Sequence, residues 1–174
     1  MERDVTNRYR GLPPRTPDML LKIVRKFYRG AVSHFDLIQE KKKTVKQALL
    51  AMRQTGDPQP LREALTVLFW EFHFYVTCWL QIDLALYRLA RLDETSRYAE
   101  VYAQYREVID RHLHVRKCAE DTAACVETQF DRYGSGMSGV EQDAYWFDGH
   151  SFTVDQESLD ALHRLYRAIM KTET

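Results

Sequence analysis

The sequence predicts an all-α protein, an antiparallel four-helix up-down bundle with long helices. The chain has only seven glycines and five prolines in 174 residues, which disfavours a turn-rich β protein. Apolar residues recur at helical spacing over long stretches. One of these stretches, residues 65–92, is apolar around its whole circumference, so the other helices are expected to wrap it.

The first predicted helix covers residues 16–53. Thr16 is suited to be its N-cap, and Pro17 is suited to its first turn. An apolar seam then continues to Arg53, with Lys42 as its single polar member. The preceding residues 1–15 combine four arginines with Gly11, Pro13 and Pro14, which predicts an irregular N-terminal arm. Residues 16–174 are expected to form one domain.

The second predicted helix covers residues 60–92, after a turn rich in helix breakers. Trp70 and Phe74 lie off its main apolar seam, so this helix has more apolar surface than one neighbour can cover. Either the other helices cover all of it, or part of it contacts a partner. A membrane span is not expected, because the apolar run from residue 65 is interrupted by Glu71 and then by Asp83, short of the about 20 residues needed.

The third predicted helix is one continuous element over residues 93–133, capped by Asp93. A glycine-rich loop follows at residues 134–139. Aromatic residues flank a turn at Asp148 and Gly149, so residues 140–154 are predicted to form a short aromatic loop or a small hairpin. The last helix begins after Thr153 or Asp155 and carries an apolar stripe to Ile169.

Charge and cysteine content narrow the class of protein further. The net charge is zero, but residues 1–53 carry thirteen basic and five acidic residues, whereas residues 54–174 carry twelve and twenty. This asymmetry indicates a basic arm for nucleic acid or a membrane surface, or two complementary parts of one bundle. Three cysteines without a framework spacing, and no signal peptide before them, predict reduced thiols and a cytoplasmic location.

Two carboxylates interrupt the central apolar helix. Glu71 and Asp83 must find partners there or have raised pKa values, because burial of an unpaired charge is costly. Arginines from the first or third helix are the expected partners, in structural ion pairs. The alternative is that one carboxylate has a functional role.

The sequence predicts no metal site and no cofactor. Dinuclear sites in helical bundles use Glu-x-x-His motifs, and the nearest match is a single Asp160-Ala-Leu-His163. His112 and His114 point to different sides of a helix, so His112 is expected to be a hydrogen-bonded core residue and His114 a solvated one. Walker, dinucleotide and hydrolase motifs are absent from the sequence.

One face of the first helix is basic. The residues Lys22, Arg25, Lys26 and Arg29 follow an i, i+3, i+4, i+7 pattern, which places them on one side of a helix. Such a stripe is suited to contact the phosphates of RNA. The alternative is a solvated face or one that meets an acidic helix.

The stretch Arg106-Glu-Val-Ile-Asp-Arg-His112 lies in a predicted helical bundle. In this it resembles the HEPN superfamily, whose members bind or cleave RNA and dimerise around an Arg-x(4–6)-His motif. The resemblance implies that Arg106 and His112, with Arg116, act on an RNA backbone. Glu107 departs from the small polar residue common after the motif arginine. The stretch from Val115 also resembles the arginine-rich helix of non-catalytic relatives, with Asp121 where histidine would stand.

Three functions follow from these patterns. The leading hypothesis is a non-enzymatic cytoplasmic protein that acts by association, as a homodimer or with another partner. It depends on the surplus apolar surface of residues 60–92 and on the missing catalytic motifs. The second is a HEPN-like protein that binds or cleaves RNA, and the third is a metal-dependent bundle enzyme.

Overall fold

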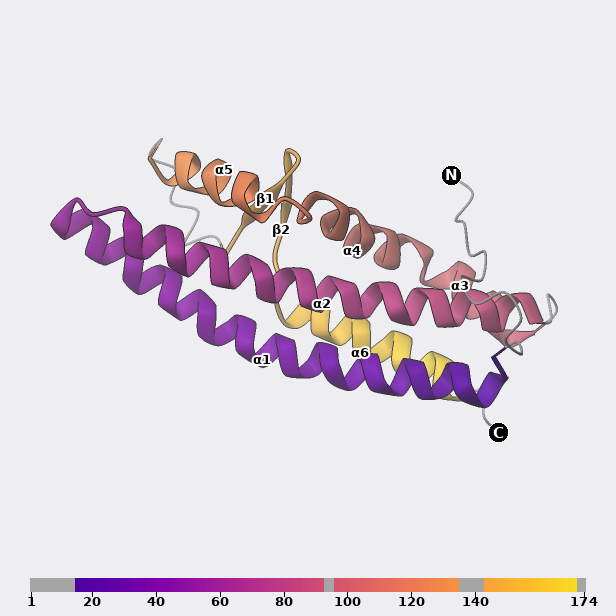
Figure 1. The fold of residues 1–174 in the computed structure, drawn as a ribbon. Helices are drawn as coiled ribbons and strands as arrows, with labels where there is room; N and C mark the ends of the chain where they lie inside the picture. The colour runs from indigo at the N-terminus through magenta and orange to yellow at the C-terminus, as the bar shows by residue number, and fades with distance from the viewer. Residues whose placement is uncertain (1–14, 93–95, 135–142, 172–174) are drawn as a thin grey trace.

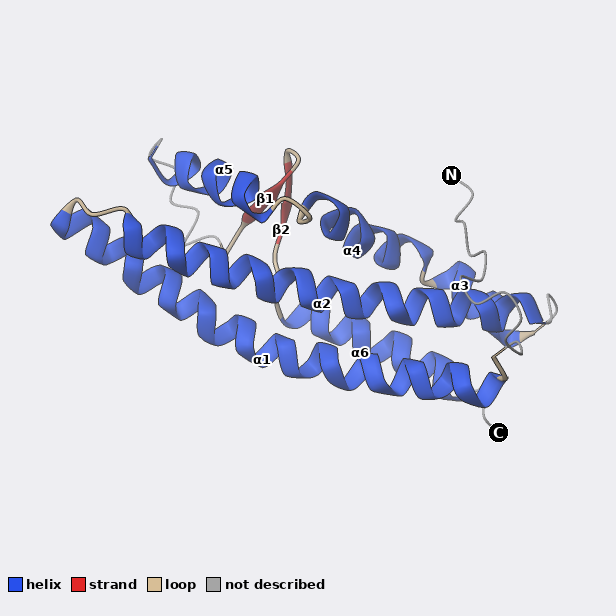
Figure 2. Ribbon diagram, in the orientation of Figure 1, coloured by secondary structure: helices blue, strands red, loops and turns tan. Residues whose placement is uncertain are grey.

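The computed structural model describes residues 15–92, 96–134 and 143–171 (Figure 1). Within these residues the chain forms six helices and one two-stranded antiparallel sheet (Figure 2). The elements are α1 (Pro17–Thr55), α2 (Gln59–Leu92), α3 (Arg97–Gln104), α4 (Arg106–Cys118), α5 (Thr122–Gly134), β1 (Tyr145–Phe147), β2 (His150–Phe152) and α6 (Gln156–Met170). The predicted N-terminal arm, the Asp93 cap and the glycine-rich loop fall largely outside the described residues.

The long helices α1 and α2 form an antiparallel pair that runs the length of the molecule (Figure 1). As predicted, the Thr16 side chain caps α1 by accepting a hydrogen bond from the Met19 N–H at 3.3 Å. The helix ends at Gly56, whose left-handed backbone, with φ of 75°, suits glycine. Gly30 faces Cys78 of α2, and a Cβ there would lie 3.4 Å from the Cys78 sulfur. The two helices therefore approach closely at their middle.

The predicted single helix over residues 93–133 is wrong, because three helices occupy this region. The chain breaks at Tyr105 and again between Cys118 and Thr122. The second break has a visible cause: Asp121 accepts a hydrogen bond from the Ala124 N–H at 3.1 Å, which starts a new helix as an N-cap does. No glycine or proline lies near Tyr105, so the sequence carries no signal for the first break. The described residues thus contain six helices where four were predicted.

Of the two alternatives predicted for this segment, an aromatic loop or a small hairpin, the structure shows the hairpin. Strands β1 and β2 pair antiparallel with Phe147 opposite His150. Asp148 and Gly149 have φ values of 48° and 76°, the left-handed pair that a tight hairpin turn requires. Aromatic rings of the hairpin pack against Phe69 and Phe72 of α2 with centroid separations of 5.1–6.2 Å. The hairpin thus covers part of the apolar surface of α2.

Lys42, the polar residue in the α1 seam, anchors the chain on both sides of the hairpin. Its buried ammonium group donates hydrogen bonds to Asp143 and Thr153 at 2.8 Å and to the Val154 carbonyl at 2.6 Å. Burial lowers the pKa of Lys42, although the hydrogen bond to Asp143 opposes this effect. Lys42, the polar residue of the seam, therefore makes a structural contact in which its ammonium group is fully hydrogen-bonded.

The last helix, α6, begins as predicted. The Asp155 side chain accepts a hydrogen bond from the Ser158 N–H at 3.0 Å. The helix lies against α1, where Tyr28 and Tyr166 stack with their ring centroids 3.8 Å apart. Among the described helices, none is both long and apolar enough to cross a membrane.

Candidate functional site

Arg106, the first residue of the HEPN-like motif, is held by carboxylates. One of its terminal nitrogens lies 2.9 Å from Asp83 and the other lies 2.7 Å from Asp110. Burial alone would lower the pKa of Arg106, but the hydrogen bond to Asp110 and the charge of Asp83 outweigh it and raise that pKa. Asp83 is completely buried. The predicted ion pair between Asp83 and an arginine of the third predicted helix is confirmed.

His112 is a core residue, as the sequence predicts. Only 2% of it is exposed, and its ring stacks on Trp79 with centroids 3.8 Å apart. Its Nδ1 lies 2.7 Å from the Val108 carbonyl oxygen, so this nitrogen must carry the proton. The other nitrogen therefore accepts a hydrogen bond, at 2.9 Å from the Ser158 hydroxyl.

A buried hydrogen-bonded chain follows from this tautomer. Because Ser158 donates to His112, the Tyr75 hydroxyl donates to the Ser158 oxygen at 2.9 Å. Burial lowers the pKa of His112 to about 4 and raises the pKa of Tyr75 to about 12. Both groups are neutral at pH 7, so the chain bonds α2, α4 and α6 together without a buried charge.

Arg116, the third candidate residue, has a different environment again. It is part-exposed and lies 3.3 Å from Glu120, one turn further along the chain. The structure thus gives Arg106, His112 and Arg116 three separate sets of partners. None of the three lines the cleft described below.

Glu71 binds a histidine where the sequence predicts an arginine. Its carboxylate lies 2.7 Å from Nδ1 of His34 on α1. The register of the antiparallel pair decides this, because Arg29, the nearest arginine of α1, lies more than one turn before His34. The His34 ring also stacks on Phe74, with centroids 5.5 Å apart. Glu71 therefore orients an aromatic surface on the outside of the α1–α2 pair.

That surface, called here the outer face, consists of His34, Leu37, Trp70 and Phe74. Trp70 and Phe74 lie one turn apart on α2 and are 52% and 50% exposed, and Leu37 is 37% exposed. Leu37 lies one turn after His34 on α1, and Trp70 lies one turn before Phe74 on α2. Because the two helices are antiparallel and His34 contacts Phe74, Leu37 lies towards Trp70. Residues 15–92, 96–134 and 143–171 thus leave part of the predicted apolar surplus of α2 uncovered.

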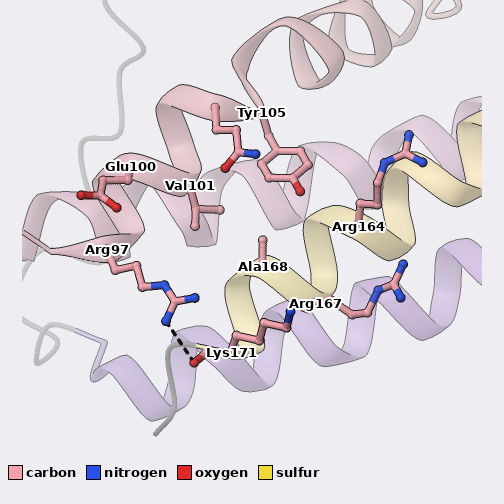
Figure 3. A pocket seen from close by; sticks show the side chains of 9 residues that line it. Arg97, Glu100, Val101, Tyr105, Arg164, Arg167, Ala168 and Lys171 are labelled. Atoms are coloured by element: carbon pink, nitrogen blue, oxygen red, sulfur yellow. Dashed lines mark hydrogen bonds between the residues drawn. The ribbon is translucent and has the colours of Figure 1, made fainter.

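A second open feature is a basic cleft of about 360 Å³ between α3 and α6 (Figure 3). Among the residues that the structure describes, its walls carry Arg97, Arg164, Arg167 and Lys171 against the single acid Glu100. Arg97 crosses the cleft and hydrogen-bonds the Lys171 carbonyl at 3.5 Å. The sequence does not predict this cleft, because one of its walls is α3, a short helix that no local signal separates from α4.

The basic stripe on α1 lies at the same end of the molecule as this cleft (Figure 1). Tyr28 of α1 contacts His163 and Tyr166 of α6, so Arg25, about one turn earlier, lies level with the C-terminal part of α6. Lys22 is exposed and pairs with Asp18 at 2.7 Å. Lys26 and Arg29 are exposed. The predicted solvated face and the predicted RNA-binding face remain alternatives.

No protein-family model, curated protein sequence or solved structure matches this chain. The HEPN resemblance therefore stays a prediction.

Three side chains that could hold a metal ion also meet on the surface. His114 and Cys118 of α4 and Asp148 of the hairpin turn each offer a ligand atom, and these atoms lie within 4.8 Å of one another. His114 is exposed, as predicted. No two histidines of the sequence have the i, i+4 spacing that predicts a metal site, but the mixed His114-x-x-x-Cys118 pair has it.

Proposed function

We propose that this chain is a non-enzymatic helical protein that acts by association, forming a homodimer through the outer face. The observation that carries the proposal is that Trp70 and Phe74, one turn apart on the most apolar helix, are each half-exposed. A tryptophan and a phenylalanine on a rigid helix are typical anchors of protein interfaces, because each can bury a large apolar area at little cost in side-chain entropy.

The geometry around these two residues supports an interface that is ordered before binding. The Glu71 carboxylate fixes the His34 ring by a 2.7 Å hydrogen bond, and that ring supports Phe74 from the side. A preordered surface loses less conformational entropy when it binds. A second copy of the chain fits such a face because a two-fold interface pairs the same apolar patch with itself.

The placement of the candidate catalytic residues supports a non-catalytic role. Arg106 is bound by two carboxylates, and His112 is 98% buried in a bonded chain. A general acid or base must reach its substrate within hydrogen-bond distance. A cytoplasmic location remains part of the proposal, because Cys78, Cys118 and Cys125 are all free thiols.

Light scattering of the full chain at micromolar concentration tests this proposal. The expected mass is twice the 20.6 kDa of one chain. Trp70→Glu should give a monomer with an unchanged helical circular dichroism spectrum, because a charge in the interface is costly. Leu50→Glu is the matched control, since Leu50 is 57% exposed on α1 outside the outer face, and it should stay dimeric. A monomeric wild type would refute the proposal.

A second candidate function is RNA binding at the basic end of the molecule, favoured by the four cationic residues of the α3–α6 cleft. The α1 stripe would extend this surface around α6. Fluorescence anisotropy with a short single-stranded RNA should show binding that weakens steeply with salt. Arg164→Ala with Arg167→Ala should weaken it, and Lys43→Ala, an exposed lysine further along α1, should not. Absence of salt-dependent binding would reject this candidate.

A further inference from the structure

The side chains of His114, Cys118 and Asp148 bring together three kinds of metal-binding atom. The His114 Nε2 and the Cys118 Sγ lie 3.7 Å apart on one face of α4. Asp148 comes from the turn of the β-hairpin, thirty residues later in the chain, and its ligand oxygen lies within 4.8 Å of both. Tertiary structure, and not one local motif, therefore assembles the cluster.

The separations are close to those of a tetrahedral metal centre. Zinc binds histidine nitrogen, thiolate sulfur and carboxylate oxygen at about 2.0–2.3 Å, so neighbouring ligand atoms lie about 3.5 Å apart in such a centre. The nitrogen–sulfur distance of 3.7 Å already has this value. The Asp148 oxygen lies within 4.8 Å of both other ligand atoms, and rotation of its exposed side chain can bring it closer.

The backbone holds these ligands in place on two rigid elements. His114 and Cys118 are one turn apart in α4, so their side chains point in the same direction. Asp148 is fixed by the hairpin turn, with φ of 48°, and the strands on each side of it are anchored in the core by Phe147 and Phe152. An ion bound here would fasten the tip of the hairpin to α4.

The surroundings favour a cation that can exchange with solvent. His114 and Asp148 are exposed and Cys118 is partly exposed, so an ion has access. A thiolate and a carboxylate together neutralise a divalent charge. The mixture of nitrogen, sulfur and oxygen atoms selects zinc or a similar transition metal over Mg²⁺ and Ca²⁺, which prefer oxygen ligands alone.

We propose that His114, Cys118 and Asp148 form a zinc site, with water in the fourth position, that fastens the β-hairpin to α4. The neighbouring His150, whose ring centroid lies 5.0 Å from that of His114, stands beside the site without binding the ion. The site is independent of the outer face, so it does not depend on the proposed dimer.

Cobalt binding to the tag-free, reduced, full-length chain tests the site directly. Co²⁺ should produce the near-ultraviolet charge-transfer band of a cobalt–thiolate bond and visible bands of tetrahedral intensity, and Zn²⁺ should displace it. Cys118→Ser should abolish the charge-transfer band. His114→Ala and Asp148→Asn should each weaken zinc binding at least about tenfold. Asparagine tolerates the left-handed turn at position 148, so the latter variant keeps the hairpin.

Controls separate this site from adventitious binding. Cys78→Ser and His73→Gln remove a thiol and an imidazole from α2 and should leave the cobalt spectrum and the zinc affinity unchanged. Zinc should also raise the melting temperature of the wild type by about 5 °C at saturating concentration, but not that of Cys118→Ser. A charge-transfer band that persists in Cys118→Ser, or equal zinc affinity in His114→Ala, would overturn the site. A tenfold loss in His150→Gln would overturn the three-ligand assignment.

Discussion

Two sides of the same helix, α2, carry similar aromatic residues and have opposite surroundings. On the inner side, Phe69 and Phe72 are 1% and 0% exposed and pack against the aromatic rings of the hairpin. On the outer side, Trp70 and Phe74 are about half-exposed, and the rings beside Phe74 are those of His34 and His73. Apolar composition alone therefore does not determine which residues build the core. The elements that pack against the helix determine which of its residues are buried.

The largest expected effect is a difference in the free energy of unfolding between substitutions on the two sides of α2. Phe72→Ala should lower the free energy of unfolding by about 3–5 kcal/mol, because it leaves a cavity among the hairpin rings. Phe74→Ala should lower it by less than about 1 kcal/mol when measured at a concentration that favours the monomer. Urea denaturation followed by circular dichroism measures both. Equal losses would mean that the outer face is packed as tightly as the core.

The next effect is a pH dependence of stability that arises on the inner side, where His112 stacks on Trp79. The pKa of His112 is lowered to about 4 from an ordinary 6.5, so the unfolded chain takes up a proton at higher pH than the folded one does. The contribution of neutral His112 to the free energy of unfolding is therefore fully present above pH 6.5. It is lost as the pH falls from 6.5 to about 4, and the total loss is roughly 3 kcal/mol.

Urea unfolding between pH 7.5 and pH 4.5 checks this dependence. The wild type should lose stability more steeply than His112→Gln, which has no group to titrate at this position. His114→Ala, on the exposed side of the same helix, should keep the wild-type slope. Identical slopes for the wild type and His112→Gln would contradict the assignment of a neutral buried histidine.

The buried ion pair gives a smaller effect at the far end of α2. Asp83→Asn should cost about 2 kcal/mol, because it removes the charge that a part-buried Arg106 faces, although Asp110 remains beside that arginine. Asp110→Asn, at a 56% exposed side chain, should cost under about 1 kcal/mol. Thermal unfolding of both variants measures the difference. A larger loss in Asp110→Asn would reverse the assignment of which acid supports the fold.

The sequence predicts the parts of the fold that local signals specify. The caps of α1 and α6, the breakers before α2 and the Asp148–Gly149 turn each fix a boundary through nearby chemistry. The break at Tyr105 has no such signal. The apolar seam continues through the Asp121 cap, and periodicity alone cannot distinguish one helix from two that share a face.

The candidate sites were less predictable, since they depend on tertiary register. The carboxylate of Asp83 meets the predicted kind of partner, whereas Glu71 meets His34, and only the α1–α2 register decides between a histidine and an arginine. The basic cleft and the metal-binding cluster each join segments far apart in the chain. A local signal for the latter existed in the His114 and Cys118 spacing.

The most direct test of the outer face is expected to change stability little. Trp70→Ser combined with Phe74→Ser should change the free energy of unfolding of the monomer by under about 1 kcal/mol. In sedimentation equilibrium, the wild type should fit a monomer–dimer association at micromolar concentration, and the double variant should remain a monomer throughout. A double variant that dimerises as the wild type does would contradict the assignment of the outer face as the surface through which this protein associates.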